Sequence, residues 1–257
     1  LSLAPATLDM DWWLLFIHPL MYATSPTALW AATAVALALL FLLPFLPSRA
    51  RQGPVAAVDP GNCNGCRRCF DDCPYAAITM VPHPNARIGR QLAVVDADLC
   101  ASCGICVGSC PSATPFRSSA ELVTGIDMPQ QPLDTLRATL QRKLALEPST
   151  RPVVVFGCDR GAPLQALTGD GVVTMGLICI GQLPPSFIEY ALRDGAAGVL
   201  VSGCREGGCA YRLGQHWTVQ RLAGQREPQL RTNVAPPERI AVAWGDAHDA
   251  PALHAAL

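Results

Sequence analysis

The cysteines constrain this chain more than any other residue type, because eight of its twelve fall into two runs with the same spacing. Each run reads C-x2-C-x2-C-x3-C-P, a pattern that indicates two [4Fe–4S] clusters. In this pattern the fourth cysteine of a run ligates the other cluster. The first cluster is therefore predicted on Cys63, Cys66, Cys69 and Cys110, and the second on Cys100, Cys103, Cys106 and Cys73.

Two other uses of closely spaced cysteines fit these runs poorly. Zinc sites pair two C-x2-C units across a longer gap, and neither a third cysteine nor a Cys-Pro ending suits them. A disulfide framework is disfavoured because such dense thiols are typical of metal sites in reducing compartments. Over about residues 57–117 the chain resembles the bacterial two-cluster ferredoxins. Gly65, Gly104 and Gly108 suit a backbone that comes close to cluster sulfide.

The composition of the chain also indicates a membrane segment. The chain has 257 residues, 50% hydrophobic, with a net charge of −1, so it can hold several domains. Arginine is matched by acid in every segment, which argues against nucleic-acid binding. Thr27–Leu46 carries no charge and can span a hydrocarbon core of about 30 Å, which predicts one transmembrane helix. The basic residues Arg49 and Arg51 come after this span, which argues against a cleaved signal peptide.

The same two arginines orient the predicted span in the membrane. By the positive-inside rule, they place the C-terminal side of the span in the cytoplasm. We therefore expect a single-pass protein of a bacterial or archaeal cytoplasmic membrane, in contact with the lipid bilayer. Its iron–sulfur domains are expected on the cytoplasmic side.

The aromatic segment before the span has its own resemblance. Residues 4–51 resemble the C-terminal part of a cytochrome b, in which a Pro-Glu-Trp-Tyr motif opens an interfacial helix ahead of a transmembrane helix. The resemblance implies that Asp11 accepts a proton from quinol, that Trp12 takes the place of the motif's tryptophan, and that a quinone binds near residues 10–20. It also implies a separate partner chain that carries haem b. Two positions depart from the motif, Met10 for proline and Trp13 for tyrosine. A plain aromatic belt with a membrane anchor is the alternative.

Residues 118–151 are predicted to form a helical linker that docks the ferredoxin-like region onto the C-terminal region. Leucines recur in it at helical spacing, at Leu133, Leu136, Leu140 and Leu144. Beyond it, buried-strand patterns alternate with a helix that opens at Pro184-Pro185 and runs through Arg193. Strand, helix and strand in this order favour a parallel sheet with right-handed crossovers. The strands are expected at 152–156, 172–180, 198–203 and 239–244.

The four remaining cysteines lie at the predicted carboxyl ends of these strands, where parallel sheets collect ligands. They are Cys158, Cys179, Cys204 and Cys209. Four thiolates suffice for one [2Fe–2S] cluster. A zinc site or simple buried cysteines are the alternatives.

A second resemblance bears on this cysteine group. Over roughly residues 152–245, and above all at Cys179–Pro185 and 195–214, the chain looks like the delta subunit of methyl-viologen-reducing hydrogenase. The resemblance implies a [2Fe–2S] domain that passes electrons between a hydrogenase or formate dehydrogenase and a heterodisulfide-reductase-type flavoprotein. The stretch after Cys158 departs from the family, which often has a second cysteine there. Three nearby arginines either balance cluster charge, face a partner or form a solvated helix face: Arg205, Arg212 and Arg221.

The fold class expected is therefore α/β and α+β multidomain: 1–51 with one transmembrane helix, 52–117 as a two-cluster ferredoxin domain, 118–151 as linker, and 152–257 as a small α/β domain with a mostly parallel sheet. No motif indicates an independent catalytic site for an organic substrate. We expect an electron-transfer subunit that joins a soluble hydrogenase, formate dehydrogenase or flavoprotein to a quinone and cytochrome b complex in the membrane. An adaptor with a zinc-bound C-terminal domain, and a membrane-tethered ferredoxin, are the alternatives.

Overall fold

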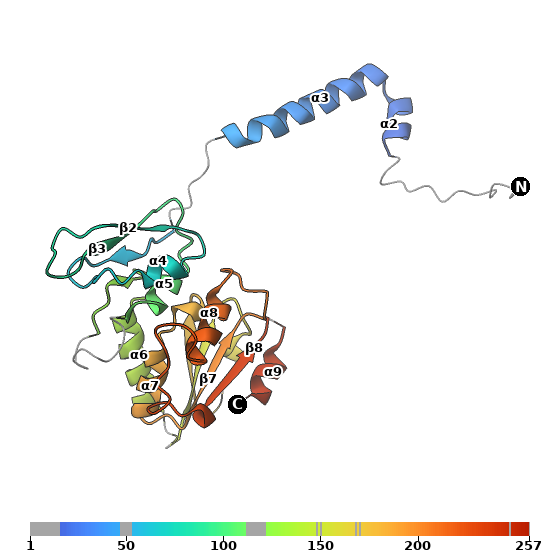
Figure 1. Cartoon of the computed structure of the whole chain (residues 1–257). Coiled ribbons are helices and arrows are strands. Elements are labelled where there is room, and N and C mark those ends of the chain that lie inside the picture. The colour runs from blue at the N-terminus through green and yellow to red at the C-terminus, as the bar shows by residue number, and fades with distance from the viewer. Residues whose placement is uncertain are drawn as a thin grey trace, which may run out of the picture. The chain divides into compact units, whose positions relative to one another are not determined.

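The chain divides into two units, Leu1–Arg51 and Gln52–Leu257, which are described separately. In this computed structural model (Figure 1) the described residues are 16–46, 53–111, 122–147, 149, 151–167, 169, 171–246 and 248–256.

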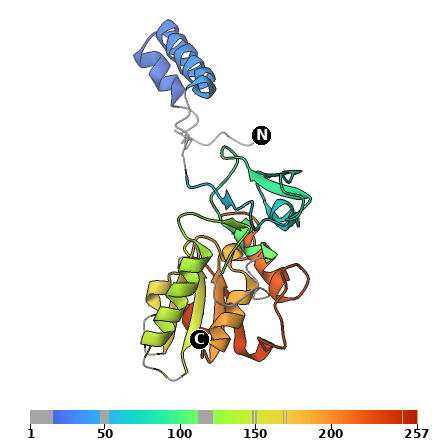
Figure 2. The same cartoon turned by 90° about the vertical axis from the view of Figure 1, so that its left-hand side faces the viewer.

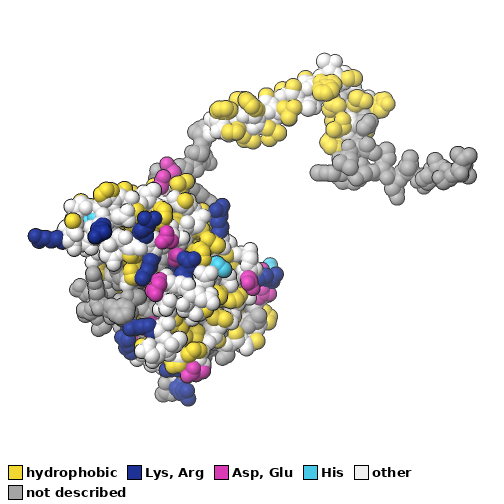
Figure 3. Space-filling model, viewed as in Figure 1, with side chains coloured by type: hydrophobic (Ala, Val, Ile, Leu, Met, Phe, Trp, Pro, Cys, Tyr) yellow, Lys and Arg dark blue, Asp and Glu magenta, His cyan; other side chains and the backbone are white. Residues whose placement is uncertain are grey.

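The first unit contains α2 (Ile17–Ala23), α3 (Pro26–Leu42) and the 3-10 turn η1 (Leu43–Phe45). Helix α3 begins at Pro26 because the hydroxyl of Ser25 accepts a hydrogen bond from the N–H of Ala28 at 3.2 Å. Pro44 lacks an N–H donor, and the α-helix ends just before it. Figure 3 shows hydrophobic side chains along these helices. None of the α3 residues is buried, and Pro26–Phe45 is a candidate membrane span by length and composition.

The ferredoxin-like region consists of short elements around two antiparallel strand pairs. Strand β1 pairs with β4, and β2 pairs with β3 as a hairpin. Each cysteine run leads into a short helix, α4 or α5, and the two helices pack together. The elements are β1 (Ala57–Val58), α4 (Arg68–Asp72), β2 (Ile78–Pro82), β3 (Gln91–Val95), α5 (Ile105–Gly108) and β4 (Ile126–Asp127). Strand β4 thus extends this region's sheet pairing beyond residue 117.

The leucine repeat of the predicted linker lies in a helix, α6 (Leu133–Leu146). The Asp127 carboxylate accepts a hydrogen bond from the N–H of Leu133 at 3.1 Å and thereby caps the first turn. Leu133, Leu136 and Leu140 are buried, as the leucine spacing predicts. Helix α6 therefore packs as part of the folded core.

The C-terminal region is built on a four-stranded parallel sheet in the order β6-β5-β7-β8, which confirms the predicted parallel arrangement. Its strands are β5 (Val153–Cys158), β6 (Val172–Leu177), β7 (Gly198–Gly203) and β8 (Ile240–Trp244). The connecting elements are η3 (Leu164–Ala166), η4 (Ile180–Gln182), α7 (Pro185–Arg193), α8 (Gly214–Leu222), η5 (Pro237–Arg239) and α9 (Ala250–Ala255).

Alternate strand residues pack on opposite faces of this sheet. Val154 and Phe156 join α6 and α7 in a core that continues into the ferredoxin-like region. Val155 packs instead with Leu253 of α9 on the other face. Figures 1 and 2 show α6 and α7 side by side, away from α9. This three-layer packing leaves the carboxyl ends of the strands pointing toward the ferredoxin-like region.

Candidate metal centres

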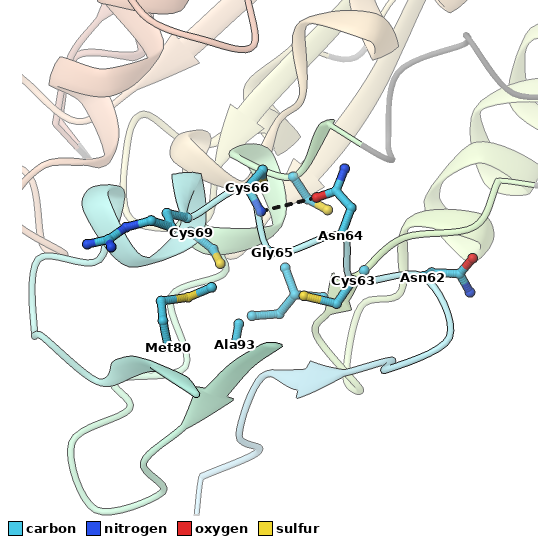
Figure 4. A pocket seen from close by; sticks show the side chains of 12 residues that line it. Asn62, Cys63, Asn64, Gly65, Cys66, Cys69, Met80 and Ala93 are labelled. Carbon is cyan, nitrogen blue, oxygen red and sulfur yellow. Dashed lines mark hydrogen bonds between the residues drawn. The ribbon is translucent and has the colours of Figure 1, made fainter. Parts of the chain in front are cut away.

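A first cavity lies between the first cysteine run and the hairpin β2–β3. Cys63, Cys66 and Cys69 line it together with Cys110 of the second run. Figure 4 shows the three cysteines of the first run around this space, with Met80 and Ala93 on its opposite side. These four cysteines are the predicted first set.

A second cavity repeats this arrangement with the two runs exchanged. Its cysteines are Cys100, Cys103 and Cys106 of the second run and Cys73 of the first. The structure therefore brings the eight cysteines together in the crossed grouping. Their roles as ligands remain a prediction.

The backbone around both cavities has matched features. Gly65 and Ser102 occupy the same position in the two runs and both have positive φ, +72° and +57°. A Cβ at Gly65 would lie 2.3 Å from the Gln91 carbonyl oxygen, so only glycine fits there. The N–H of Arg68 donates to the Cys66 sulfur, and that of Ile105 donates to the Cys103 sulfur. Such N–H donors favour thiolate and cluster sulfur.

Burial makes the bare thiols hard to ionise. It raises the pKa of Cys69 to about 12 and that of Cys103 to about 11, and it raises the pKa of Cys106 well above the usual range. Neighbouring cysteines raise these pKa values further, so thiolates grouped this closely require a bound cation. The cavities, the four sulfurs at each and the donated N–H groups fit two iron–sulfur clusters.

The third cysteine group lies at the carboxyl ends of the sheet, as predicted. Cys158 ends β5, Cys179 comes after β6, Cys204 comes after β7, and Cys209 lies in the loop beyond. The sulfurs of Cys158 and Cys204 are 3.9 Å apart. Two thiolates on one tetrahedral metal, with bonds of about 2.3 Å, would be about 3.8 Å apart.

The four sulfurs of this group form a ring of alternating partners. Hydrogen bonds from the thiols of Cys179 and Cys204 lower the pKa values of the Cys158 and Cys209 thiols. The same contacts raise the pKa values of the two donors. Among the described residues, no group of three or more His, Cys, Asp or Glu side chains has the geometry of a metal-ion site. The fit therefore rests on the sulfur pairing, which suits a single ion or a [2Fe–2S] cluster.

The third group adjoins the second cavity. Cys103 packs with Cys179 in one apolar cluster that Cys209 and Tyr75 also contact. Arg212 lies just beyond Cys209 in the same loop; its guanidinium donates to the Pro74 carbonyl at 3.2 Å and lies 5.2 Å from the centre of the Tyr75 ring. The two cysteine groups therefore belong to one continuous piece of structure.

Several sequence expectations need correction here. Arg205 and Arg212 are exposed, but Arg221 is buried, so the solvated helix face is wrong for it. Gly108 does not serve the cavities; a Cβ there would lie 2.1 Å from the Gly181 carbonyl oxygen of the C-terminal region. Sequence reasoning also missed Asp72, a buried carboxylate next to a cysteine, whose burial only the tertiary structure reveals.

The predicted quinone site falls largely outside the described residues. Asp11 and Trp12 lie outside them, as does the first half of the stretch 10–20. The described part of that stretch includes the start of α2. The roles of Asp11 and Trp12 therefore stay predictions.

Two protein-family models match separate parts of the chain. Residues 62–114 match the 4Fe–4S dicluster domain, and residues 169–257 match the delta subunit of methyl-viologen-reducing hydrogenase. Both matches begin after residue 51, so the cytochrome b resemblance receives no support from them.

The curated relatives are also subunits of redox enzymes. An iron–sulfur subunit of the F420-non-reducing hydrogenase of Archaeoglobus profundus is 35% identical over 66 residues, 26% of this chain and 47% of the relative. An iron–sulfur subunit of the vhc F420-non-reducing hydrogenase of Methanococcus voltae is 39% identical over 46 residues, covering 18% and 32%. One subunit of the ferredoxin:CoB-CoM heterodisulfide reductase of Methanosarcina mazei is 30% identical over 198 residues, covering 74% and 22%. The chain thus spans less than half the length of these relatives. It is related to iron–sulfur subunits of hydrogenases and to a subunit of a heterodisulfide reductase.

Proposed function

We propose that this chain is an electron-transfer subunit that carries two [4Fe–4S] clusters and one [2Fe–2S] cluster. The observation that carries the proposal is that Cys103, of the second cavity, and Cys179, of the third group, belong to one apolar cluster with Ile105. Electron transfer by tunnelling needs centres held close together in a rigid, buried setting. The two crossed cavities and the adjoining third group supply such a setting in one folded unit.

The residues that would hold the clusters are the three cysteine groups described above. Bound iron–sulfur clusters supply one-electron redox chemistry at potentials set by hydrogen bonds, burial and nearby charge. The chain's own part is to exclude water and to donate N–H groups to sulfur. The N–H groups of Arg68 and Ile105 do so at equivalent places in the two runs.

The relatives support a redox enzyme as the soluble partner. Their names place them in hydrogenase and heterodisulfide reductase complexes. We propose that the C-terminal region of this chain exchanges electrons with a hydrogenase, a formate dehydrogenase or a heterodisulfide-reductase-type flavoprotein. Co-purification with such an enzyme from native membranes would identify which of them it is.

Metal analysis of the anaerobically purified full chain tests the proposal. Two four-iron clusters and one two-iron cluster predict about ten iron atoms per chain, with matching acid-labile sulfide. EPR of the reduced protein should then show both kinds of cluster. About eight iron atoms together with one zinc would instead favour the adaptor with a structural zinc domain. An iron content near zero would refute electron transfer altogether.

We further propose that α3 anchors the chain in the membrane and that the segment before it serves a quinone. The uncharged span Pro26–Phe45 supports the anchor. For the quinone, Asp11→Asn removes the predicted proton acceptor while keeping the side-chain shape. We expect at least a tenfold loss of quinone-linked turnover in native membranes, because general-base catalysis contributes about 10²–10⁴-fold.

Asp9→Asn is the matched control, since it removes a neighbouring carboxylate that the cytochrome b resemblance does not assign. Electron transfer to an artificial soluble acceptor should be unchanged in both variants. Unchanged quinone-linked turnover in Asp11→Asn would leave α3 as a plain tether and the chain as a membrane-bound ferredoxin.

A further inference from the structure

Arg221 of α8 is buried, with its side chain only 1% exposed, at the junction between the ferredoxin-like and C-terminal regions. One terminal nitrogen, Nη2, donates to the Asp72 carboxylate at 2.6 Å and to the Ser109 hydroxyl at 2.8 Å. The other, Nη1, donates to the Gly181 carbonyl at 3.0 Å. A single guanidinium therefore spans three separate segments of the chain.

Each of these segments leads directly to a different cysteine group. Asp72 precedes Cys73, which lines the second cavity, and Ser109 precedes Cys110, which lines the first. Gly181 lies two residues after Cys179 of the third group. Asp72 and Ser109 also occupy equivalent positions in the two cysteine runs, one residue before the fourth cysteine. Arg221 thus contacts both halves of the repeated motif at the same place.

Further contacts surround the Arg221 guanidinium. The Ser109 hydroxyl also donates to the Asp72 carboxylate at 2.6 Å, which closes a triangle with Arg221. Trp217, one turn earlier on α8, donates its Nε1–H to the Asp72 carbonyl at 3.1 Å. A Cβ on Gly108 would come within 2.7 Å of Arg221 Nη1, so a larger residue there would displace the guanidinium.

The side chains that pair at Asp72 have an excess of positive charge. Its carboxylate pairs with both Arg221 and Arg226. The Arg226 guanidinium lies over the Trp217 ring, 3.4 Å from the ring centre, and its side chain is 25% exposed. These three side chains, one negative and two positive, carry a net positive charge. Because Arg221 and Asp72 are buried, water screens this charge weakly.

We propose that Arg221 is a positioning residue that fixes the third cysteine group against the two ferredoxin-like groups and whose charge favours the reduced clusters. The proposal rests on the proposed electron-transfer function. Reduction adds one electron to a cluster that is already anionic, so a nearby buried positive charge raises its reduction potential. The three hydrogen bonds act separately from the charge, because they fix distance.

Charge-changing variants of the full chain separate these two roles. Arg221→Gln should lower the reduction potentials of the ferredoxin-like clusters, and Asp72→Asn should raise them. We expect shifts of about tenfold in the one-electron reduction equilibrium, which corresponds to about 59 mV. Arg221→Lys keeps the charge but lacks the planar fork, so it should keep near-native potentials while weakening the magnetic interaction between the reduced second and third centres. EPR-monitored redox titration measures both quantities.

Two controls match these variants. Arg231→Gln removes an arginine from Glu189, another buried carboxylate with an arginine partner, and should leave all potentials unchanged. Ser109→Ala removes a neutral partner of Arg221 and should shift the potentials less than Arg221→Gln does. It also gives a junction variant with unchanged charge if Asp72→Asn fails to assemble clusters.

The outcomes distinguish failure of this proposal from failure of the proposed function. Shifts of the same sign in Arg221→Gln and Asp72→Asn, or no shift in either, would overturn the electrostatic role while leaving the clusters established. Native magnetic interaction in both Arg221 variants would overturn the positioning role. Absence of any cluster signal in the unmodified chain would refute electron transfer itself.

Discussion

Cys73→Ala is expected to remove the cluster of the second cysteine run, although Cys73 belongs to the first run. The reason is the crossed arrangement, in which Cys73 lines the same cavity as Cys100, Cys103 and Cys106. A [4Fe–4S] cluster with three remaining thiolates loses iron readily, so we expect the iron of the two ferredoxin-like clusters to fall from about eight to about four atoms per chain. The measurement is iron and sulfide content together with the EPR spectrum of the reduced full chain.

Two further variants identify which cluster is lost. The spectrum of Cys73→Ala should match that of Cys103→Ala, which removes another residue of the second cavity. It should differ from that of Cys66→Ala, which affects the first cavity at its exposed cysteine. A Cys73→Ala spectrum that matches Cys66→Ala would mean that each run holds its own cluster, and the crossed grouping would be wrong.

Much of the candidate site could be anticipated because it depends on local spacing. Two residues between cysteines leave few ways to arrange three thiols, and the cavities group them as the spacing predicts. The third group could be placed for a different reason. In a parallel sheet all carboxyl ends lie at one edge, so residues such as Cys158 and Cys204 meet there whatever loops connect them.

The contacts between the ferredoxin-like region and the C-terminal region could not be predicted from the sequence. Arg221 and Asp72 are 149 residues apart, and no local pattern links them. The buried face of helix α8 also cannot be recognised from the sequence, because its buried side chains include the polar Gln215, Thr218 and Arg221. Arg221 can be buried because the Gly181 carbonyl and the Asp72 carboxylate accept its hydrogen bonds, and the Thr218 hydroxyl donates to the Gly214 carbonyl of its own helix. A prediction that relies on apolar periodicity therefore treats this face as solvated.

The hairpin β2–β3 could not be predicted from the sequence because of its connecting loop. Its strands are joined by residues 83–90, a loop much longer than the two-residue turns that mark hairpins in a sequence. Yet the hairpin is needed for the first cavity, since Met80 and Ala93 form one of its walls. Cysteine spacing predicts where thiols gather and leaves open what encloses them.

Gly214→Ala is expected to empty the third cysteine group while leaving the ferredoxin-like clusters in place. A Cβ at this position would lie 2.2 Å from the Cys179 sulfur and 3.5 Å from the Cys209 sulfur. The first distance is far shorter than a van der Waals contact, so the Cys179 sulfur must move away from its partners. Overpacking of this kind costs about 1–3 kcal/mol, and the displaced sulfur can no longer complete the site. Metal content should fall by that of the third group alone, to about eight iron atoms per chain.

Helix propensity strengthens this test, because it favours alanine at position 214 and so opposes the destabilisation expected from the overpacking. Gly214 begins α8, where alanine is intrinsically favoured over glycine by up to about 1 kcal/mol, so a loss of metal cannot come from a weakened helix. Gly169→Ala is the matched control, since a Cβ there meets nothing within 4 Å. It should keep the full metal content. If Gly214→Ala also kept it, the Cys179 sulfur would not belong to the third centre, and the ring of four sulfurs would have to be replaced by a smaller ligand set.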